Sequence, residues 1–398
     1  MLTYDLDKRG NKTMYEYLYE LIKEDISDGK LKAGEKLPSK RGLSQHLQIS
    51  VKTVENAYEQ LLLEGYIRSE EKRGYYVNKI AVVTGGAPGY AAPVKRFQEE
   101  TYLADLTANN IRYDRFPFAT WAKVMRETLT DYNTSLLKTV PFNGVLQLRE
   151  AIADHLNRYR GMQVSADHII IGAGTEYLYN RLLQLLGPDV KFGVENPGYR
   201  KITKIYDENG VDWDYVNIDD KGMKVDELRM KDINVAHVSP EHHFPIGLVM
   251  PVARRQELLN WAAEEPGRYI IEDDFDCEFR MQGKPIPSIQ SRDRSHRVIY
   301  MNTFSKSLSS TIRISYMVLP IPLMVRYNHV LSFYACTVSN FDQYTLTRFI
   351  QEGYLEKHIN RMRKFYRNSR DRILGCIRNH RLYPQVTIKE ENAGLHFL

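Results

Sequence analysis

A stretch rich in Gly, Pro and Ala at residues 84–93 divides this chain into a short N-terminal part and a long C-terminal part. Such a composition is typical of a flexible linker of about twenty residues. The length of 398 residues exceeds one ordinary domain, and a hydrophobic content of 43% allows a sizeable core. The sequence therefore predicts a domain at residues 1–78, a linker at 79–101 and a second domain at 102–398.

Cysteine usage and the N-terminus indicate where the chain acts. Its three cysteines stand far apart, without the spacing of a disulfide framework or a zinc site, which suits a reducing compartment. The N-terminus lacks the basic and apolar regions of a signal peptide, and no apolar run reaches about 18 residues. We expect a soluble, cytoplasmic protein with no membrane contact. The net charge of +5 is too small for this length to indicate a partner.

Residues 14–77 carry the pattern of three short helices followed by a hairpin. Ser39 and Ser50 each stand where an N-cap residue begins a helix, and Gly65 ends the last helix. Residues 66–77 then show two short strand patterns around a polar turn. This order of elements is the plan of a winged helix-turn-helix.

The region from Lys30 to Lys52 holds six Lys and Arg residues against one Glu. A local excess of positive charge is what a surface facing DNA phosphates requires. The solvated face of a small interaction domain would show the same excess, so the charge alone leaves both interpretations open.

Three segments, Leu37–Arg41, Ser50–Tyr58 and Leu63–Ile67, closely resemble the GntR-type winged helix-turn-helix. The resemblance implies binding to double-stranded DNA through the arginine that follows Pro38-Ser39-Lys40, the first turn of the third short helix and the tip of the wing. Only contacts to bases would specify a sequence. The implied DNA-binding residues are Ser39, Arg41, Ser50, Lys52, Thr53, Asn56, Lys72, Arg73 and Gly74.

Beyond the linker, apolar strands alternate with helices, which predicts an α/β domain with a mostly parallel sheet. Lys306 follows one of these strands and stands among hydroxyl residues. A partly desolvated lysine near other positive charge loses its proton and can form a Schiff base with an aldehyde, of which pyridoxal 5′-phosphate (PLP) is the natural one. The alternative is a surface lysine in a serine-rich loop.

Three other segments fit the same cofactor. Asp273 ends a strand, where a carboxylate can pair with a pyridine nitrogen. Residues 169–176 form a strand, a glycine turn and a helix start, which offer free backbone N–H groups to a phosphate. Arg313 is a candidate for a charge-assisted contact with that phosphate.

In order and spacing these segments resemble the fold-type I aminotransferases, from about residue 105 to the C-terminus. The resemblance implies that Lys306 is the Schiff-base lysine, that Asp273 pairs with the pyridinium nitrogen and that Tyr199 stacks on the cofactor ring. It also implies a set of phosphate ligands: Gly174, Thr175, Glu176, Thr303, Ser305 and Arg313.

Several positions depart from the pattern of these aminotransferases. Phe275 stands where relatives usually place a tyrosine that donates to the phenolic oxygen of the cofactor, and His243 stands beside the ring where Gln or Asn is usual. Arg200 and Lys201 follow Tyr199 where relatives often place one arginine for the acid group of an effector, and the sequence does not decide between them. His242 and His243 lack a third ligand at a fitting spacing, so no metal site is predicted.

The last residues, 392–398, resemble the opening of the final small-domain sheet of the aminotransferase fold. Family members continue beyond this point and supply an arginine for a substrate carboxylate. The predicted domain is therefore truncated at its C-terminal small domain: either the sequence is a fragment or its effector pocket is incomplete.

A GntR-type domain joined to an aminotransferase-like domain is similar to the MocR/GabR-type regulators of the GntR family. The resemblance implies a PLP-dependent transcriptional regulator that senses an amine, an amino acid or PLP itself, with at most partial transamination chemistry. It also implies a head-to-tail homodimer. Two alternatives stay open: a PLP-dependent aminotransferase with an accessory DNA-binding domain, and an inert dimerisation scaffold without cofactor.

Overall fold

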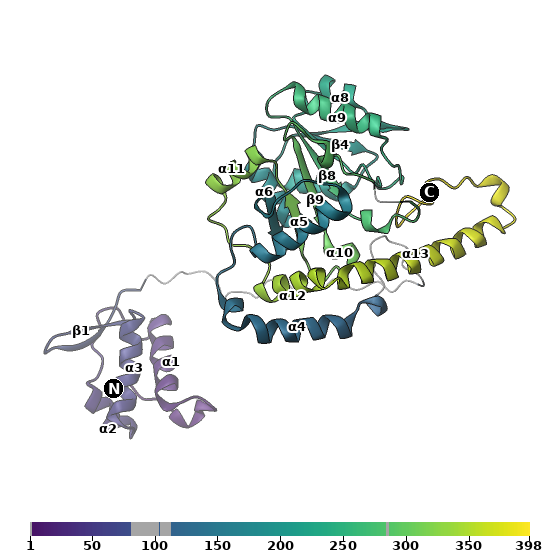
Figure 1. The fold of residues 1–398 in the computed structure, drawn as a ribbon. Coiled ribbons are helices and arrows are strands. Elements are labelled where there is room, and N and C mark those ends of the chain that lie inside the picture. The colour runs from purple at the N-terminus through teal and green to yellow at the C-terminus, as the bar shows by residue number, and fades with distance from the viewer. Residues whose placement is uncertain (1, 81–102, 104–112, 284–285) are drawn as a thin grey trace. The chain divides into compact units, whose positions relative to one another are not determined.

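The computed structural model describes residues 2–80, 103, 113–283 and 286–398. The chain splits into two compact units, Met1–Asp105 and Leu106–Leu398, and each unit is described by itself (Figure 1). The predicted linker at 79–101 lies almost entirely outside the described residues. No helix in the described ranges is both long enough and apolar enough to cross a membrane.

The N-terminal unit is a three-helix domain with a two-stranded antiparallel hairpin. The predicted caps are present, since the hydroxyl oxygens of Ser39 and Ser50 accept the backbone N–H groups of Gly42 and Thr53. The elements are α1 (Met14–Ser27), α2 (Lys40–Leu47), α3 (Val51–Leu63), β1 (Ile67–Glu70) and β2 (Gly74–Val77).

The core of this unit fixes α2 against α3. Leu43 of α2 and Val54 of α3 are fully buried together with Leu18 and Ile22 of α1. The hydroxyl of Tyr58 donates to the carbonyl oxygen of Pro38 at 3.0 Å, which ties the middle of α3 to the segment before α2. The N-terminal turn of α3 is left at the surface, as a DNA-reading helix requires.

The C-terminal unit is built on one eight-stranded mixed sheet. The four pairings β4–β5, β4–β7, β7–β8 and β8–β9 are parallel, whereas β10 pairs antiparallel with both β3 and β9. In spatial order the strands are β3 (Ile169–Gly172), β10 (Ser315–Val318), β9 (Val298–Thr303), β8 (Tyr269–Asp274), β7 (Val235–Val238), β4 (Phe192–Asn196), β5 (Trp213–Asp219) and β6 (Gly222–Met223).

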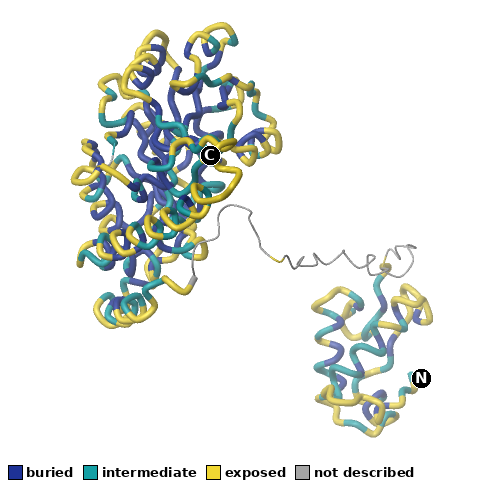
Figure 2. The backbone as a smooth tube through the Cα atoms, turned by 90° about the vertical axis from the view of Figure 1, so that its right-hand side faces the viewer, coloured by how far each residue is buried: buried dark blue, intermediate teal, exposed yellow. Residues whose placement is uncertain are grey.

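Helices cover both faces of this sheet (Figure 1). Alternate residues of β3 point to opposite sides: Ile169 and Ile171 pack against α5 and α12, whereas Ile170 packs against α6 and α11. Strands β3, β7 and β10 are accordingly buried at every residue, and Figure 2 shows the buried residues in the interior of this unit. The helices are α4 (Phe118–Tyr132), α5 (Leu146–Arg160), α6 (Thr175–Leu186), α7 (Arg200–Glu208), α8 (Val225–Met230), α9 (Val252–Glu264), α10 (Phe304–Ser307), α11 (Ile321–Val330), α12 (Asn340–Gln351) and α13 (Tyr354–Arg378).

The topology brings polar residues to one edge of the sheet. Because β4, β7, β8 and β9 run parallel, their carboxyl ends lie at the same edge, where α/β sheets bind ligands. Asp273 is in register with Met301 of β9, five residues before Lys306. The fold therefore places Asp273 at the end of β8 and Lys306 on the helical turn that follows the neighbouring strand β9.

Candidate functional site

Lys306 lies on α10, a single helical turn that directly follows β9. The hydroxyl oxygen of Thr303 caps this turn by accepting the N–H of Ser305 at 3.1 Å. Burial lowers the pKa of the Lys306 amine, and the negative charge of Asp276 opposes that shift. A larger fraction of this amine is therefore unprotonated at neutral pH than for a surface lysine, and this is the form that attacks an aldehyde.

Asp273 is held by side chains that the sequence analysis missed. The hydroxyl of Tyr179 donates to Asp273 Oδ2 at 2.8 Å, and His237 Nε2 lies 3.7 Å from the same oxygen. The hydroxyl of Tyr206 lies 2.9 Å from His237 Nδ1 behind them. Asp273 Oδ1 accepts no hydrogen bond from the described residues, so this oxygen is available to the N–H of a bound ring.

The loop between β3 and α6, the first turn of α6 and the side chain of Arg313 lie together, and we call this group of residues the cup. Gly174 takes a φ of +96°, and a Cβ at this position would collide with the guanidinium of Arg313. The first backbone N–H groups of α6 have no carbonyl partner within the helix and carry the positive end of its dipole. Glycine at position 174 therefore permits the close approach of Arg313 to this helix end.

Hydroxyl groups line the same region. The Thr303 hydroxyl donates to Ser305 Oγ at 2.8 Å and accepts from the Ser315 hydroxyl at 2.8 Å. Ser315 was not predicted as a site residue, because β10, which carries it, was not recognised as a strand. β10 follows β9 after a single helical turn and runs antiparallel to it, so it falls outside the alternation of strands and helices that predicts the other strands.

Glu176 stands in the first turn of α6 between two cations. Its Oε2 accepts a hydrogen bond from Arg313 Nη2 at 2.8 Å, and its Oε1 pairs with the ammonium of Lys201. Burial raises the pKa of Glu176, but its hydrogen bonds, including those from Lys201 and Arg313, bring it down to about 2. The carboxylate cannot itself bind a phosphate, so only the backbone N–H of Glu176 suits the predicted role.

His243 and Glu195 form a buried pair next to Tyr199. His243 Nε2 lies 3.4 Å from Glu195 Oε2, which also accepts the N–H of Ser239 at 3.0 Å. Burial raises the pKa of Glu195 to about 8 and lowers the pKa of His243 to about 4. Both side chains are therefore uncharged at neutral pH. Tyr199 itself is 40% exposed and meets Phe244 edge to face.

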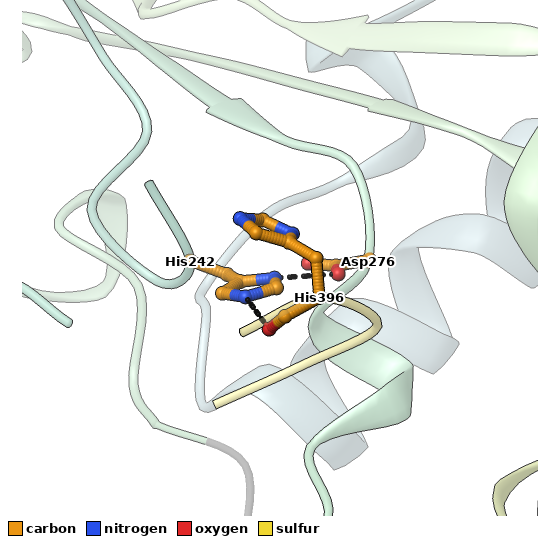
Figure 3. A group of neighbouring side chains, drawn as sticks. All are labelled: His242, Asp276 and His396. Atoms are coloured by element: carbon orange, nitrogen blue, oxygen red, sulfur yellow. Dashed lines mark hydrogen bonds and ion pairs between the residues drawn. The ribbon is translucent and has the colours of Figure 1, made fainter. Parts of the chain in front are cut away.

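The structure brings His242 together with Asp276 and His396, two residues that the sequence analysis did not place beside it (Figure 3). The ligating atoms of the three side chains lie within 4.8 Å of one another. His242 Nδ1 lies 2.7 Å from Asp276 Oδ2, its Nε2 lies 3.1 Å from the carbonyl oxygen of His396, and the two imidazole rings stack at 3.8 Å. The ring centroid of Phe275 lies 6.0 Å from that of His242. The cluster joins the 392–398 segment to the loops near Lys306.

The predicted DNA-binding residues lie on α2, α3 and the hairpin. The side chains of Arg41, Lys52 and Lys72 are exposed. Glu55, one turn into α3, accepts hydrogen bonds from both Lys40 and Lys52 at 3.0 Å. The remaining predicted residues are Ser39 and Ser50 at the helix caps, Thr53 and Asn56 on α3, and Arg73 and Gly74 at the hairpin turn.

Two protein families match the chain. The family described as bacterial regulatory proteins, gntR family, matches residues 14–77, and the family described as aminotransferase class I and II matches residues 102–393. Each match falls within one structural unit, apart from the first few residues of the second match.

Curated relatives match over nearly the whole chain. The HTH-type transcriptional regulator YdeL of Bacillus subtilis is 40% identical over 97% of this chain and 83% of its own length. The probable rhizopine catabolism regulatory protein MocR of Rhizobium meliloti is 29% identical over 99% of this chain and 83% of its own. The pyridoxine biosynthesis regulator PdxR of Corynebacterium glutamicum is 29% identical over 95% of this chain and 81% of its own length.

Solved structures of aminotransferases share the fold of the larger unit. A kynurenine aminotransferase of Pyrococcus horikoshii, crystallised with PMP, aligns over 73% of each chain with a TM-score of 0.63 and 27% identity. A multiple substrate aminotransferase of Thermococcus profundus also aligns over 73% of each chain, with a TM-score of 0.62 and 26% identity. The predicted fold is thereby confirmed, and the chain belongs to the MocR-type transcriptional regulators, in which a GntR helix-turn-helix domain is joined to an aminotransferase class I and II domain.

Proposed function

We propose that this regulator binds PLP at Lys306 and uses it to sense a small amine or amino acid. The observation that carries the proposal is the meeting, at one sheet edge, of a lysine with a lowered pKa, an aspartate with an open oxygen and an anion cup. A chain that only dimerised through this unit would need none of these features.

The residues present fit the cofactor. Asp273 Oδ1 would accept the ring N–H, while Tyr179 fixes the other carboxylate oxygen. The N-terminus of α6, Arg313 and the hydroxyl of Thr303 would hold the phosphate. When bound, PLP supplies an electrophilic carbon that exchanges one amine for another. Lys306 would bind that carbon until an effector amine replaces it.

Phe275 bears on whether the site turns over a substrate, and Arg200 bears on how it binds an effector. Phe275 has no hydroxyl and cannot donate to the phenolic oxygen of the cofactor, which weakens the case for turnover. Of the two basic residues after Tyr199, Lys201 is paired with Glu176, whereas Arg200 forms no ion pair within the described residues. We therefore assign the acid group of the effector to Arg200.

The proposal also includes binding to operator DNA and a head-to-tail dimer. Arg41, Lys52 and the wing would contact an operator, with the regulator acting in the cytoplasm. At the proposed cofactor site the side chain of Arg313 is 51% exposed. A second copy, arranged head to tail, would close the site, and the two winged helices of such a dimer would read two half-sites.

Binding of the full-length protein to DNA tests this function. Operator fragments are selected from a random double-stranded library, and affinity is followed by fluorescence anisotropy with PLP and a panel of amines and amino acids. We expect one of them to change operator affinity by at least about fivefold, the lower range of allosteric coupling. Lys204→Ala, which removes an exposed lysine of α7, should respond like the wild type, and Lys306→Ala should not respond. A Lys306→Ala variant that responds fully would contradict the proposal.

A further inference from the structure

Glu176 is bonded to two basic side chains at the cup. Its carboxylate bonds to Arg313, which comes from the connection between β9 and β10, and to Lys201, which comes from the first turn of α7. Glu176 and Arg313 also lie directly over Gly174: a Cβ there would meet the guanidinium and would lie 3.0 Å from Glu176 Oε2. The cation best suited to hold a phosphate is thus already paired with an anion of the chain itself.

A phosphate in this cup would compete with that carboxylate. Arg313 Nη2 already donates to Glu176 Oε2 and to the carbonyl oxygen of Ala173, and two anions that share one guanidinium repel each other. The pKa of Glu176, lowered to about 2, keeps the carboxylate ionised at neutral pH, so it does not give up Arg313 by taking a proton. Glu176 must instead turn away from Arg313.

Lys201 offers the carboxylate a second partner. Its ammonium holds the other oxygen of Glu176 and belongs to a different helix, so this bond can persist after the bond to Arg313 breaks. From this arrangement we propose that Glu176 is a displaceable internal anion: it binds both Arg313 and Lys201 when the cup is empty, and an incoming phosphate displaces it from Arg313 while its bond to Lys201 persists. The inference deepens the proposed function, because it describes how the same site is kept reversible toward PLP.

The exchange makes two variants act in opposite directions. Glu176→Gln removes the competing charge and should tighten phosphate binding. Lys201→Gln removes the cation that would hold Glu176 after it leaves Arg313. Glu176 should then stay bound to Arg313, and phosphate binding should weaken. In the Glu176→Gln background, Lys201→Gln should have no further effect, whereas a lysine that acted only through its own charge would still weaken binding.

The experiment uses full-length protein and three probes: PLP, pyridoxal, which has the same aldehyde without the phosphate, and inorganic phosphate. We expect Glu176→Gln to bind PLP and inorganic phosphate at least about fivefold more tightly than the wild type by calorimetry, and to bind pyridoxal equally. Glu208→Gln, which removes an exposed charge from the end of α7, should stay within about twofold of the wild type for all three probes.

Unchanged or weaker binding of phosphate and PLP by Glu176→Gln would overturn the inference, as would a further weakening by Lys201→Gln in that background. Failure of the proposed function looks different. In that case neither aldehyde would label Lys306 after borohydride reduction, while the inorganic phosphate titration would still decide the role of Glu176.

Discussion

Both units of the chain hold a glutamate between two basic side chains, but the two glutamates are placed differently. Glu55 lies on the surface of α3 between Lys40 and Lys52, and the side chain of Lys52 is 69% exposed. Glu176 lies at the end of α6 beside a glycine turn and is held by Lys201 and Arg313. The first arrangement is an open helix face, and the second is a cup with converging backbone N–H groups.

This difference determines how much one charge matters. DNA phosphates are bound by many basic side chains at once, and each adds a small, salt-dependent amount. A cup binds one phosphate, so each of its few donors contributes more. Substitutions should therefore have large effects in the C-terminal cup and small effects on the face of α3.

A third glutamate, Glu195, should show the largest effect, because it is buried without a charged partner. Burial raises the pKa of Glu195 from 4.5 to about 8. Between these two pH values the folded chain keeps a proton on Glu195 that the unfolded chain releases. The wild type should therefore lose stability, relative to Glu195→Gln, by about 1.4 kcal/mol for each pH unit between 5 and 8. Denaturant unfolding followed by tryptophan fluorescence measures this, since all three tryptophans lie in the C-terminal unit. A difference that does not vary with pH would contradict the uncharged Glu195–His243 pair.

Arg313→Gln should produce the next largest effect. Loss of a charge-assisted bond to the phosphate should weaken PLP binding by about 10- to 100-fold, because such bonds contribute about 1.5–3 kcal/mol. Pyridoxal binding should stay unchanged, and Arg326→Gln, an exposed arginine of α11, serves as the matched control. Equal weakening of PLP and pyridoxal would show that Arg313 supports the fold of the site rather than the phosphate.

Lys52→Ala should have a moderate effect on DNA binding. The loss of one phosphate contact should weaken binding to all sequences alike and lower the slope of log affinity against log salt by about one. Lys23→Ala is the control, since Lys23 pairs with Glu64 at the other end of α3. An unchanged salt slope would remove Lys52 from the DNA interface.

Glu55→Gln should have the smallest effect and tests the comparison directly. Exposed ion pairs contribute about 0–1 kcal/mol, so freeing Lys40 and Lys52 should tighten DNA binding by no more than about fivefold. If Glu55→Gln changed DNA affinity more than Glu176→Gln changes phosphate affinity, a single charge would matter more on the open face of α3 than in the cup. That result would contradict the comparison.

Much of the fold follows from local patterns in the sequence. Ser39 and Ser50 could be recognised as caps because an N-cap hydroxyl needs only its own helix. Asp273 and Thr303 could be placed at one edge because parallel strands end together. The strand β10 was not predicted, because its antiparallel position between β3 and β9 breaks the alternation of strands and helices and depends on the whole sheet.

The contacts that adjust the site could not be predicted in the same way. Glu176 lies 25 residues before Lys201 and 137 before Arg313, and the sequence carries no signal for such pairs. Tyr179 reaches Asp273 from the second turn of α6, which depends on how that helix packs on the sheet. The neighbours of His242 were missed for the same reason, because Asp276 and His396 come from distant segments.

The most direct test of PLP binding is an absorbance measurement on the full-length protein supplied with PLP, before and after borohydride, followed by peptide mass spectrometry. We predict a visible Schiff-base band that borohydride bleaches, a label of one pyridoxyl group on Lys306, and neither band nor label in Lys306→Ala. A protein that shows no visible band with PLP, or that carries the label on another lysine, would contradict the proposed site.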